Sequence, residues 1–350
     1  MSLFSRLWNA LTGGAASTDS ASSSTQTLLA DEEELPQRRP AGDDAWWKNP
    51  PPPPPAPTAS AALIDQTLYD ALTRTLDDPE IELPRMPAVA DKALIQLREN
   101  TVDFRALADV VQQDAALTAQ LLRVANSVTY RGFSEIRSLD LAFARLGQRT
   151  VRSVILGTTI RALAIRTGGA TRSIGEELWR ASLAAAAVCG ELAVRIGENE
   201  DDAFLSGLLH DIGNLGVLRV CYDHAQQRGA RIEPPLFAGL AERWHEHLGM
   251  RLAGSWGLPD PLPELIGNHH RAPRPGDPLT TRRNMLRMTD VLVAMMGYTP
   301  TTLSPAAALD GAADALQTAA AIALGLSSNE ETCDWLSGLP DRVRSRVEVF

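Results

Sequence analysis

A histidine and an aspartate stand side by side in an otherwise apolar stretch, Leu205 to Gly216. The apolar residues of this stretch recur at steps of three and four, which predicts a buried helix. Burying an ionised carboxylate is costly unless a metal ion or a charged partner compensates it, so the pair His210-Asp211 needs an explanation. Two explanations stay open: a metal pocket, or a pair that is hydrogen-bonded to neighbouring helices and only holds the bundle together.

Helix geometry limits what this pair can do. Adjacent helical residues point about 100° apart, so only a kinked or terminal helix lets both side chains reach one ion. Gly213 and Gly216 follow directly, and glycine is typical of a helix end or of a closely approaching backbone. We therefore expect a distortion of the helix close to His210-Asp211.

Two more histidines, His269-His270, precede a turn that contains Pro273 and Pro275. This position predicts a helix end, and both imidazoles could face the same cleft as His210. One buried and one solvated histidine is an equally good interpretation.

The elements that must position these residues are helices. Alanine is abundant, alternating β-branched runs are rare, and amphipathic segments of 8 to 20 residues are joined by short polar turns, so we predict an all-α fold, a multi-helix bundle. No fixed-period repeat is visible. We expect a leading helix within residues 61–80, a main domain over 81–275, and a C-terminal helical extension over 276–350.

The first 60 residues differ in composition. A short amphipathic helix is expected over 1–14, and it could contact a partner protein or, through residues 1–11, a membrane surface; the single basic residue Arg6 favours the partner. Residues 15–60 are rich in serine, acidic residues and proline, which predicts a disordered proline-rich arm.

Charge, apolar content and cysteines exclude several classes of function. The formal net charge of -10 argues against binding nucleic acid. No apolar stretch is long enough to span a bilayer. The three cysteines, Cys189, Cys221 and Cys333, have no metal-type or redox-type spacing, and we expect a cytoplasmic protein.

Several short motifs occur together in an order that resembles the HDOD domain, the regulatory relative of the HD phosphohydrolases in bacterial signalling proteins. The resemblance covers residues 81–275 and implies a bundle of the HD-superfamily type. The matching motifs are Leu83-Pro-x-x-Pro87, Leu121-Leu-Arg-x-Ala-Asn-Ser127, Ile136-x-Ser-Leu139, Leu146-Gly147, Leu178-Trp179, Gly207-Leu-Leu-His-Asp-Ile-Gly213, Trp256-x-Leu-Pro259 and His269-His270.

The HD superfamily uses histidines and aspartates to hold one or two metal ions, and such a metal activates water for attack on a phosphate ester. The resemblance thus implies a degenerate metal or ligand pocket, which would hold a divalent iron, manganese or zinc ion if it is still occupied. Of His245 and His247, which cannot both face inward, the surroundings of His247 match the family pattern better. The candidate pocket residues are His210, Asp211, His247, His269, His270 and Asp290.

Two departures from the family pattern argue against catalysis. Ala181 stands where relatives commonly have a histidine ligand, although Glu176 or Glu177 could supply a carboxylate instead. The Gly-Tyr-Pro signature of the branch that hydrolyses cyclic di-GMP is missing after His270. Asn126-Ser127, Gly207 and Gly213 have a structural role by the same resemblance, Asn126-Ser127 as a joint between two helical halves.

The favoured hypothesis is a non-catalytic signalling module that acts through contacts with a protein partner supplied in trans, with no catalytic residue of its own. The alternative is a metal-dependent phosphohydrolase acting on a nucleotide or cyclic dinucleotide. A third hypothesis is a sensor whose pocket binds a nucleotide without turnover.

Overall fold

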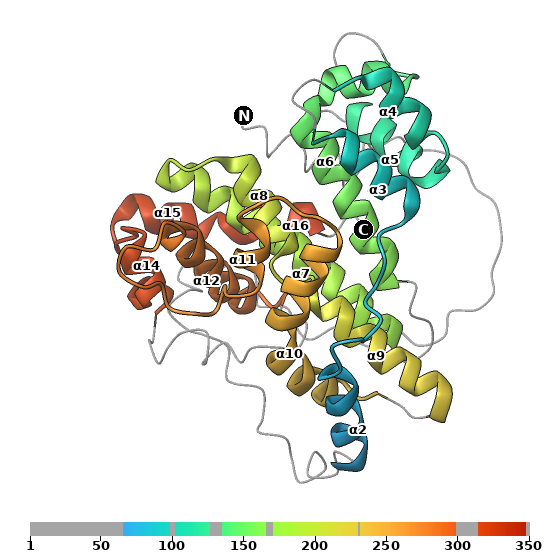
Figure 1. Ribbon diagram of the computed structural model, residues 1–350. Coiled ribbons are helices and arrows are strands. Elements are labelled where there is room, and N and C mark those ends of the chain that lie inside the picture. The colour runs from blue at the N-terminus through green and yellow to red at the C-terminus, as the bar shows by residue number, and fades with distance from the viewer. Residues whose placement is uncertain are drawn as a thin grey trace, which may run out of the picture.

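The computed structural model describes residues 66–98, 102–126, 135–165, 171–229, 232–298 and 314–347. These segments contain helices and no strand, which confirms the predicted all-α fold (Figure 1). The predicted helix over 1–14 and the predicted arm over 15–60 lie outside the described residues. In chain order the elements are α2 (Gln66–Leu76), α3 (Ala88–Gln96), α4 (Phe104–Val111), α5 (Ala115–Asn126), α6 (Leu139–Ile165), α7 (Arg172–Ile196), α8 (Glu200–Leu209), α9 (Gly213–Arg228), α10 (Pro234–Ser255), α11 (Leu262–Ile266), α12 (Thr280–Met295), the 3₁₀ turn η4 (Ala315–Gln317), α14 (Ala319–Ala323), α15 (Glu330–Ser337) and α16 (Leu339–Val347).

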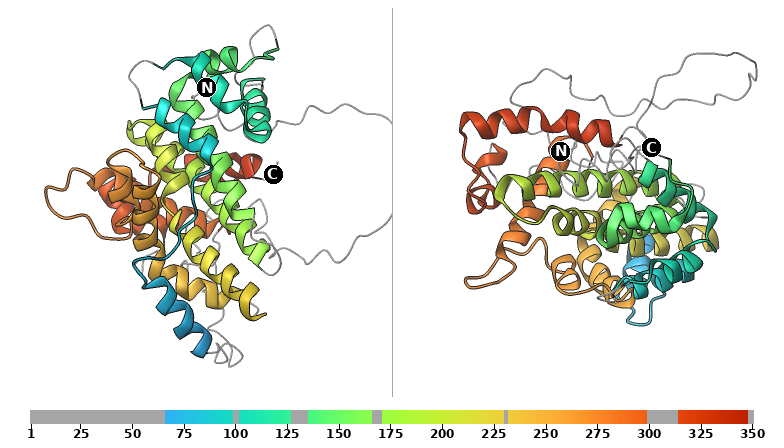
Figure 2. Two further views of the ribbon diagram at one scale, coloured as in Figure 1. Left: turned by 45° about the vertical axis from the view of Figure 1, so that its right-hand side comes forward. Right: turned by 90° about the horizontal axis from the view of Figure 1, so that it is seen from above.

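Helix α7 is the centre of the bundle. Helices α6, α8, α12 and α16 all pack against it, and Figure 2 shows α16 running alongside it when the molecule is seen from above. The alanines of the run 184–187 are 0 to 2% exposed. Because alanine adds only one methyl group, neighbouring helices can approach the α7 backbone closely on several sides.

The apolar stretch around His210 is not one helix. Helix α8 ends at Leu209, the residues His210 to Ile212 form a turn, and α9 begins at Gly213. The expected distortion is therefore present, and it takes the form of a complete break between two helices. This break frees the side chains of His210 and Asp211 from the 100° separation of a regular helix.

Two glycines, one on each side of this turn, allow it to pack closely against the neighbouring helices α7 and α10. A Cβ atom on Gly207 would lie 2.5 Å from the carbonyl oxygen of Ala185 on α7, and one on Gly213 would lie 1.8 Å from the carbonyl oxygen of His245 on α10. Both distances are far inside van der Waals contact. The predicted structural role of Gly207 and Gly213 therefore has a concrete form: only glycine lets α8 and α9 come this close to α7 and α10.

Asn126 connects the end of α5 to the segment before α6. Its Oδ1 accepts a hydrogen bond from the backbone N–H of Ile136 at 2.7 Å, and its Nδ2 donates to the carbonyl of the same residue at 2.7 Å. This bidentate contact fits the predicted joint, whereas Ser127 lies outside the described residues. Further along, Gly147 adopts φ 77° inside α6 and kinks the helix there.

Helices at both ends of the described chain pack against the central bundle. Helix α2 packs on α9 and α10 and buries Leu72 and Leu76 completely. At the other end, α12 packs on α14, and Arg342 of α16 pairs with Glu191 of α7 at 3.1 Å. Within the described residues, none of the helices combines the length and apolarity that crossing a bilayer requires.

Gly213→Ala should destabilise the protein strongly, because the new methyl group can only be accommodated if α9 and α10 move apart. Overpacking of this kind typically costs about 1–3 kcal/mol or more, and thermal unfolding followed by circular dichroism would show the loss. Gly239→Ala is the matched control, since Gly239 is exposed on α10 with nothing within 4 Å of its added Cβ. That control should be neutral or stabilise by up to about 1 kcal/mol. Equal melting temperatures for the two variants would contradict the tight crossing.

Candidate metal centre

Six polar side chains from four places in the fold meet at one point inside the bundle. His210 and Asp211 come from the turn between α8 and α9, His245 comes from α10, His269 and His270 come from the turn after α11, and Asp290 comes from α12. Ligand atoms of five of them form two overlapping groups, in each of which all atoms lie within 4.8 Å of one another, and the Asp211 carboxylate lies 3.5 to 3.7 Å from three of the histidines. The groups are His245, His269 and His270, and His210, His269 and Asp290.

Three of the imidazoles are oriented in the same way. The Nδ1 atoms of His210, His245 and His269 donate to the backbone carbonyls of Gly207 (2.8 Å), Ala241 (2.6 Å) and Ile266 (2.8 Å). Each acceptor lies three or four residues before its histidine. With the proton held at Nδ1, each ring directs its Nε2 into the cluster.

At the centre of the cluster, the Nε2 atoms of two histidines lie within hydrogen-bond distance of the Nε2 atom of a third. His245 Nε2 lies 3.4 Å from His269 Nε2 and 3.0 Å from His270 Nε2. Because Nδ1 of His245 donates to Ala241, its Nε2 has a lone pair that can accept a hydrogen bond from a neighbouring ring. Imidazole nitrogens and carboxylate oxygens that converge in this way are a donor set that a divalent metal ion prefers, so the residues fit a metal.

His210 is charged in the metal-free protein. Its Nε2 donates to Oδ1 of Asp290 at 3.1 Å, and Oδ2 of Asp211 lies 3.6 Å away. Burial works against the charged ring, yet the carboxylate of Asp211 and the hydrogen bond to Asp290 raise the pKa of His210 to about 9. Both ring nitrogens therefore act as donors.

The two carboxylates are ionised. Burial would raise the pKa of Asp211, but the charge of His210 and the hydrogen bond from His269 hold this pKa well below its usual range. Burial likewise opposes ionisation of Asp290, and the hydrogen bond from His210 outweighs it and lowers the pKa. His270 is neutral, unlike His210, because burial and the neighbouring His269 lower its pKa to about 3.

Five of the six residues predicted for the pocket come together here: His210, Asp211, His269, His270 and Asp290. The prediction for His247 is wrong, since this side chain is exposed and packs edge-on against the ring of Trp244. His245 takes the expected place at 3% exposure. A signal for this was present in the sequence, because His245 continues the buried stripe Ala241, Leu248 and Leu252 at steps of three and four, and His247 does not.

Glu246 is a site residue that the sequence analysis missed. Its Oε1 accepts a hydrogen bond from the backbone N–H of His270 at 3.0 Å and lies 3.8 Å from Nδ1 of His269. It thereby ties α10 to the turn that carries both histidines. No motif singles it out, because its role depends on the contact between two helices.

Ala181 lies beside the cluster, where the resemblance implied a lost ligand. It is buried on α7 and lines a small pocket together with Asp211. The suggested substitutes do not replace it: Glu176 pairs with Arg172 at the surface at 3.1 Å, and Glu177 is exposed. Neither Ala181 nor the two glutamates therefore offers a metal-ligating side chain on the α7 side of the cluster.

Comparison with known proteins identifies the family. The sequence profile of the HDOD domain matches residues 83–272, which is more than half of the chain. The chain belongs to the HDOD domain family. Asp290 lies beyond the matched range, so the HDOD domain of this protein completes its cluster with a residue from the following helix.

Solved structures share the fold of this HDOD protein. A candidate metal-dependent phosphohydrolase from Shewanella amazonensis matches with a TM-score of 0.55 and 21% identity, covering 79% of this chain and 99% of that one. An HDOD domain protein from Geobacter sulfurreducens matches with a TM-score of 0.51 and 21% identity, covering 81% and 97%. A candidate signal transduction protein from Marinobacter aquaeolei matches with a TM-score of 0.52 and 22% identity, covering 83% of this chain and 66% of that one.

A curated relative from Treponema pallidum, an uncharacterised protein, is 24% identical over 217 residues. The match covers 59% of this HDOD protein and 41% of the relative, so the chain spans less than half the length of that protein. The relative therefore supports a shared domain and not a shared overall organisation.

The metal-free protein should lose stability between pH 7 and pH 9. A histidine whose folded pKa is raised stabilises the fold fully below its unfolded pKa of about 6.5, and this contribution disappears as the pH rises through the folded value of about 9. The expected loss between pH 7 and pH 9 is on the order of 2 kcal/mol, measured by urea unfolding after treatment with a chelator. The lowered pKa values of His270 and the aspartates act below pH 7, outside this window.

Asp290→Asn provides the control for this pH dependence. It keeps the shape of the side chain but removes one of the two carboxylate charges that support protonated His210, so the variant should lose less stability between pH 7 and pH 9 than the wild type. Parallel curves for the wild type and the variant would show that the His210–Asp290 pair does not carry the effect.

Proposed function

We propose that this HDOD protein is a regulatory module of bacterial signal transduction, whose histidine–aspartate cluster binds one divalent metal ion that organises the domain and does not hydrolyse a phosphate ester. The observation that carries this proposal is the burial of the cluster: the side chains of His210, His245 and His269 are 0 to 4% exposed. These buried side chains shield a bound metal ion from solvent on three sides, and this shielding hinders the approach of a phosphate ester.

The donor set supports iron, manganese or zinc as the ion. Imidazole nitrogens with one or two carboxylates suit these metals, and three of the imidazoles already carry their protons on the nitrogen that faces away from the cluster. Nε2 atoms of the histidines and the two carboxylates would hold such an ion, which would supply positive charge to the cluster. His210 would give up its Nε2 proton on binding, since a metal ligand needs the neutral ring.

Two observations argue against the hydrolase alternative. Ala181 provides no ligand on the α7 side, and the pocket next to it has room for about a single water molecule, far less than a nucleotide needs. The name of the Shewanella protein, a candidate metal-dependent phosphohydrolase, keeps hydrolysis as the second candidate function. A nucleotide sensor without turnover is the third.

The protein partner belongs to the proposal as well. The name of the Marinobacter protein, a candidate signal transduction protein, supports a signalling role, and the family resemblance suggests that a partner supplied in trans delivers the signal. The buried thiols of Cys189 and Cys221, whose pKa values burial raises to about 12, suit a reducing cytoplasm.

Protein purified without chelator should contain close to one equivalent of divalent metal, measured by elemental mass spectrometry. His245→Ala should reduce the affinity for that metal at least tenfold, because it removes a nitrogen from the centre of the cluster. His247→Ala is a matched control, two residues away on the same helix, and should bind metal like the wild type. Metal-free wild-type protein, or an equal loss in both variants, would refute the proposed metal centre.

The metal-loaded protein should not hydrolyse cyclic di-GMP, cyclic di-AMP or bis-p-nitrophenyl phosphate above the background rate. Product formation can be followed by chromatography, with the His245→Ala protein as the blank. Hydrolysis that depends on metal and is lost in His245→Ala would replace the regulatory proposal with the hydrolase. Tight binding of a cyclic dinucleotide without product would instead favour the sensor.

A further inference from the structure

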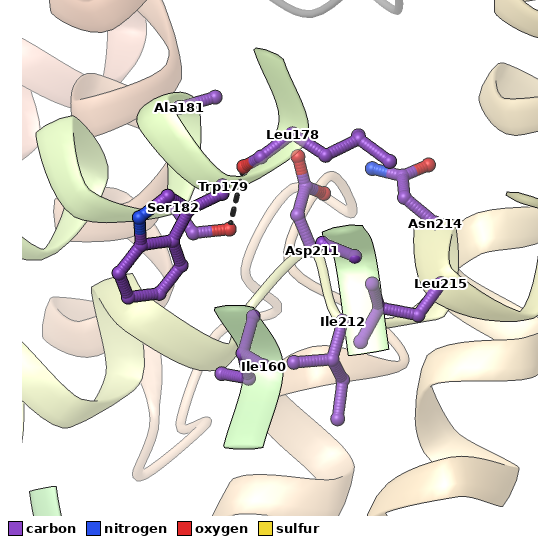
Figure 3. Close-up of a pocket in the computed structure, with 10 residues that line it drawn as sticks. Ile160, Leu178, Trp179, Ala181, Ser182, Asp211, Ile212, Asn214 and Leu215 are labelled. Atoms are coloured by element: carbon purple, nitrogen blue, oxygen red, sulfur yellow. Dashed lines mark hydrogen bonds between the residues drawn. The ribbon is translucent and has the colours of Figure 1, made fainter. Parts of the chain in front are cut away.

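A small pocket lies on the α7 side of the cluster, next to Asp211. It is lined by Leu178, Trp179, Ala181 and Ser182 of α7, and by Asp211 and Asn214 from the turn and the start of α9, among others (Figure 3). Its volume of about 10 Å³ is that of a single water site. The methyl group of Ala181 leaves this space open, whereas most longer side chains at this position would fill it.

Asn214 has no partner for either end of its amide. The residue is 1% exposed, and neither Nδ2 nor Oδ1 makes a hydrogen bond within the described part of the chain. An unmade hydrogen bond at a buried polar group costs about 1–3 kcal/mol, so an amide with both ends unpaired is strongly unfavourable in a dry pocket. In Figure 3 the Asn214 amide and the Asp211 carboxylate both point towards Leu178.

The chemistry of the lining specifies the occupant. Asn214 offers one donor group at Nδ2 and one acceptor at Oδ1, and the ionised carboxylate of Asp211 offers a second acceptor. A molecule that satisfies all three must have two donor protons, at least one lone pair, no charge, and a size that fits about 10 Å³. Water has all of these properties.

We propose that this pocket binds one water molecule, which donates to Asp211 and to Asn214 Oδ1 and accepts from Asn214 Nδ2. Asn214 is then a positioning residue, because through this water it fixes the carboxylate that faces His210, His245 and His269 at 3.5 to 3.7 Å. The effect on metal affinity rests on the proposed metal centre, whereas the water site does not.

The decisive variant is Asn214→Leu, which keeps the branched shape and removes both polar atoms. If the pocket is hydrated, the variant loses the water and its hydrogen bonds, and its melting temperature in metal-free form falls. If the pocket is dry, the same change removes an unpaired amide and the melting temperature rises, which would overturn the proposal. The sign of the shift decides between the two.

Crystal structures at about 2 Å resolution or better would test the site directly. The wild type should show an ordered water in contact with Asp211 and Asn214, and Asn214→Leu should not. A pocket without density in the wild type would overturn the proposal. If Asn214→Leu does not fold, Ala181→Val fills the space from the opposite wall and should expel the same water.

Metal affinity distinguishes a positioning role of Asn214 from a purely structural one, because replacing a residue that only supports the fold would leave the affinity unchanged. Asn214→Leu should bind metal about tenfold more weakly than the wild type, the usual effect of losing a group that orients a ligand. Asn214→Ser, which keeps a hydroxyl group able to donate and accept, should recover part of this loss. Unchanged affinity in Asn214→Leu would overturn the positioning role. A wild type that binds no metal would refute the metal centre and leave the water site to be judged by the crystal structure and the melting temperature.

Discussion

The site depends on three hydrogen bonds that run from histidine Nδ1 atoms to backbone carbonyls. The acceptors are the carbonyls of Gly207, Ala241 and Ile266, each on the helix that leads to its histidine. A local bond of this kind needs no distant partner to set the ring orientation, so each helix brings its imidazole already aligned. What the tertiary fold adds is the convergence of α8, α10 and α11 on one point.

That convergence requires backbones that approach one another more closely than side chains normally allow. Gly207 brings α8 onto α7, Gly213 brings α9 onto α10, and a Cβ on Gly249 would lie 2.7 Å from Ile266, where α10 meets α11. The glycines are therefore not flexible points. They are points of close contact between helices, and they set how far apart the histidines lie.

Much of this could be predicted from the sequence because periodicity and turn residues report local structure. The break near His210 followed from its glycines, and the gathering of His269, His270 and Asp290 followed from the family resemblance. The choice between His245 and His247 was wrong because the motif was given more weight than the buried stripe of α10. Glu246 and the unpaired amide of Asn214 could not be predicted, since they depend on which helix lies opposite, and one sequence does not contain that information.

The distance along the chain between the cluster residues has a further consequence. His210 and Asp290 are 80 residues apart, and they contact each other at 3.1 Å. An ion held by both would bind only the folded chain, because the unfolded chain does not hold these two residues close together. By mass action the free energy of unfolding would then rise with the concentration of the free ion, so under the proposed metal binding the stability of the domain reports metal supply.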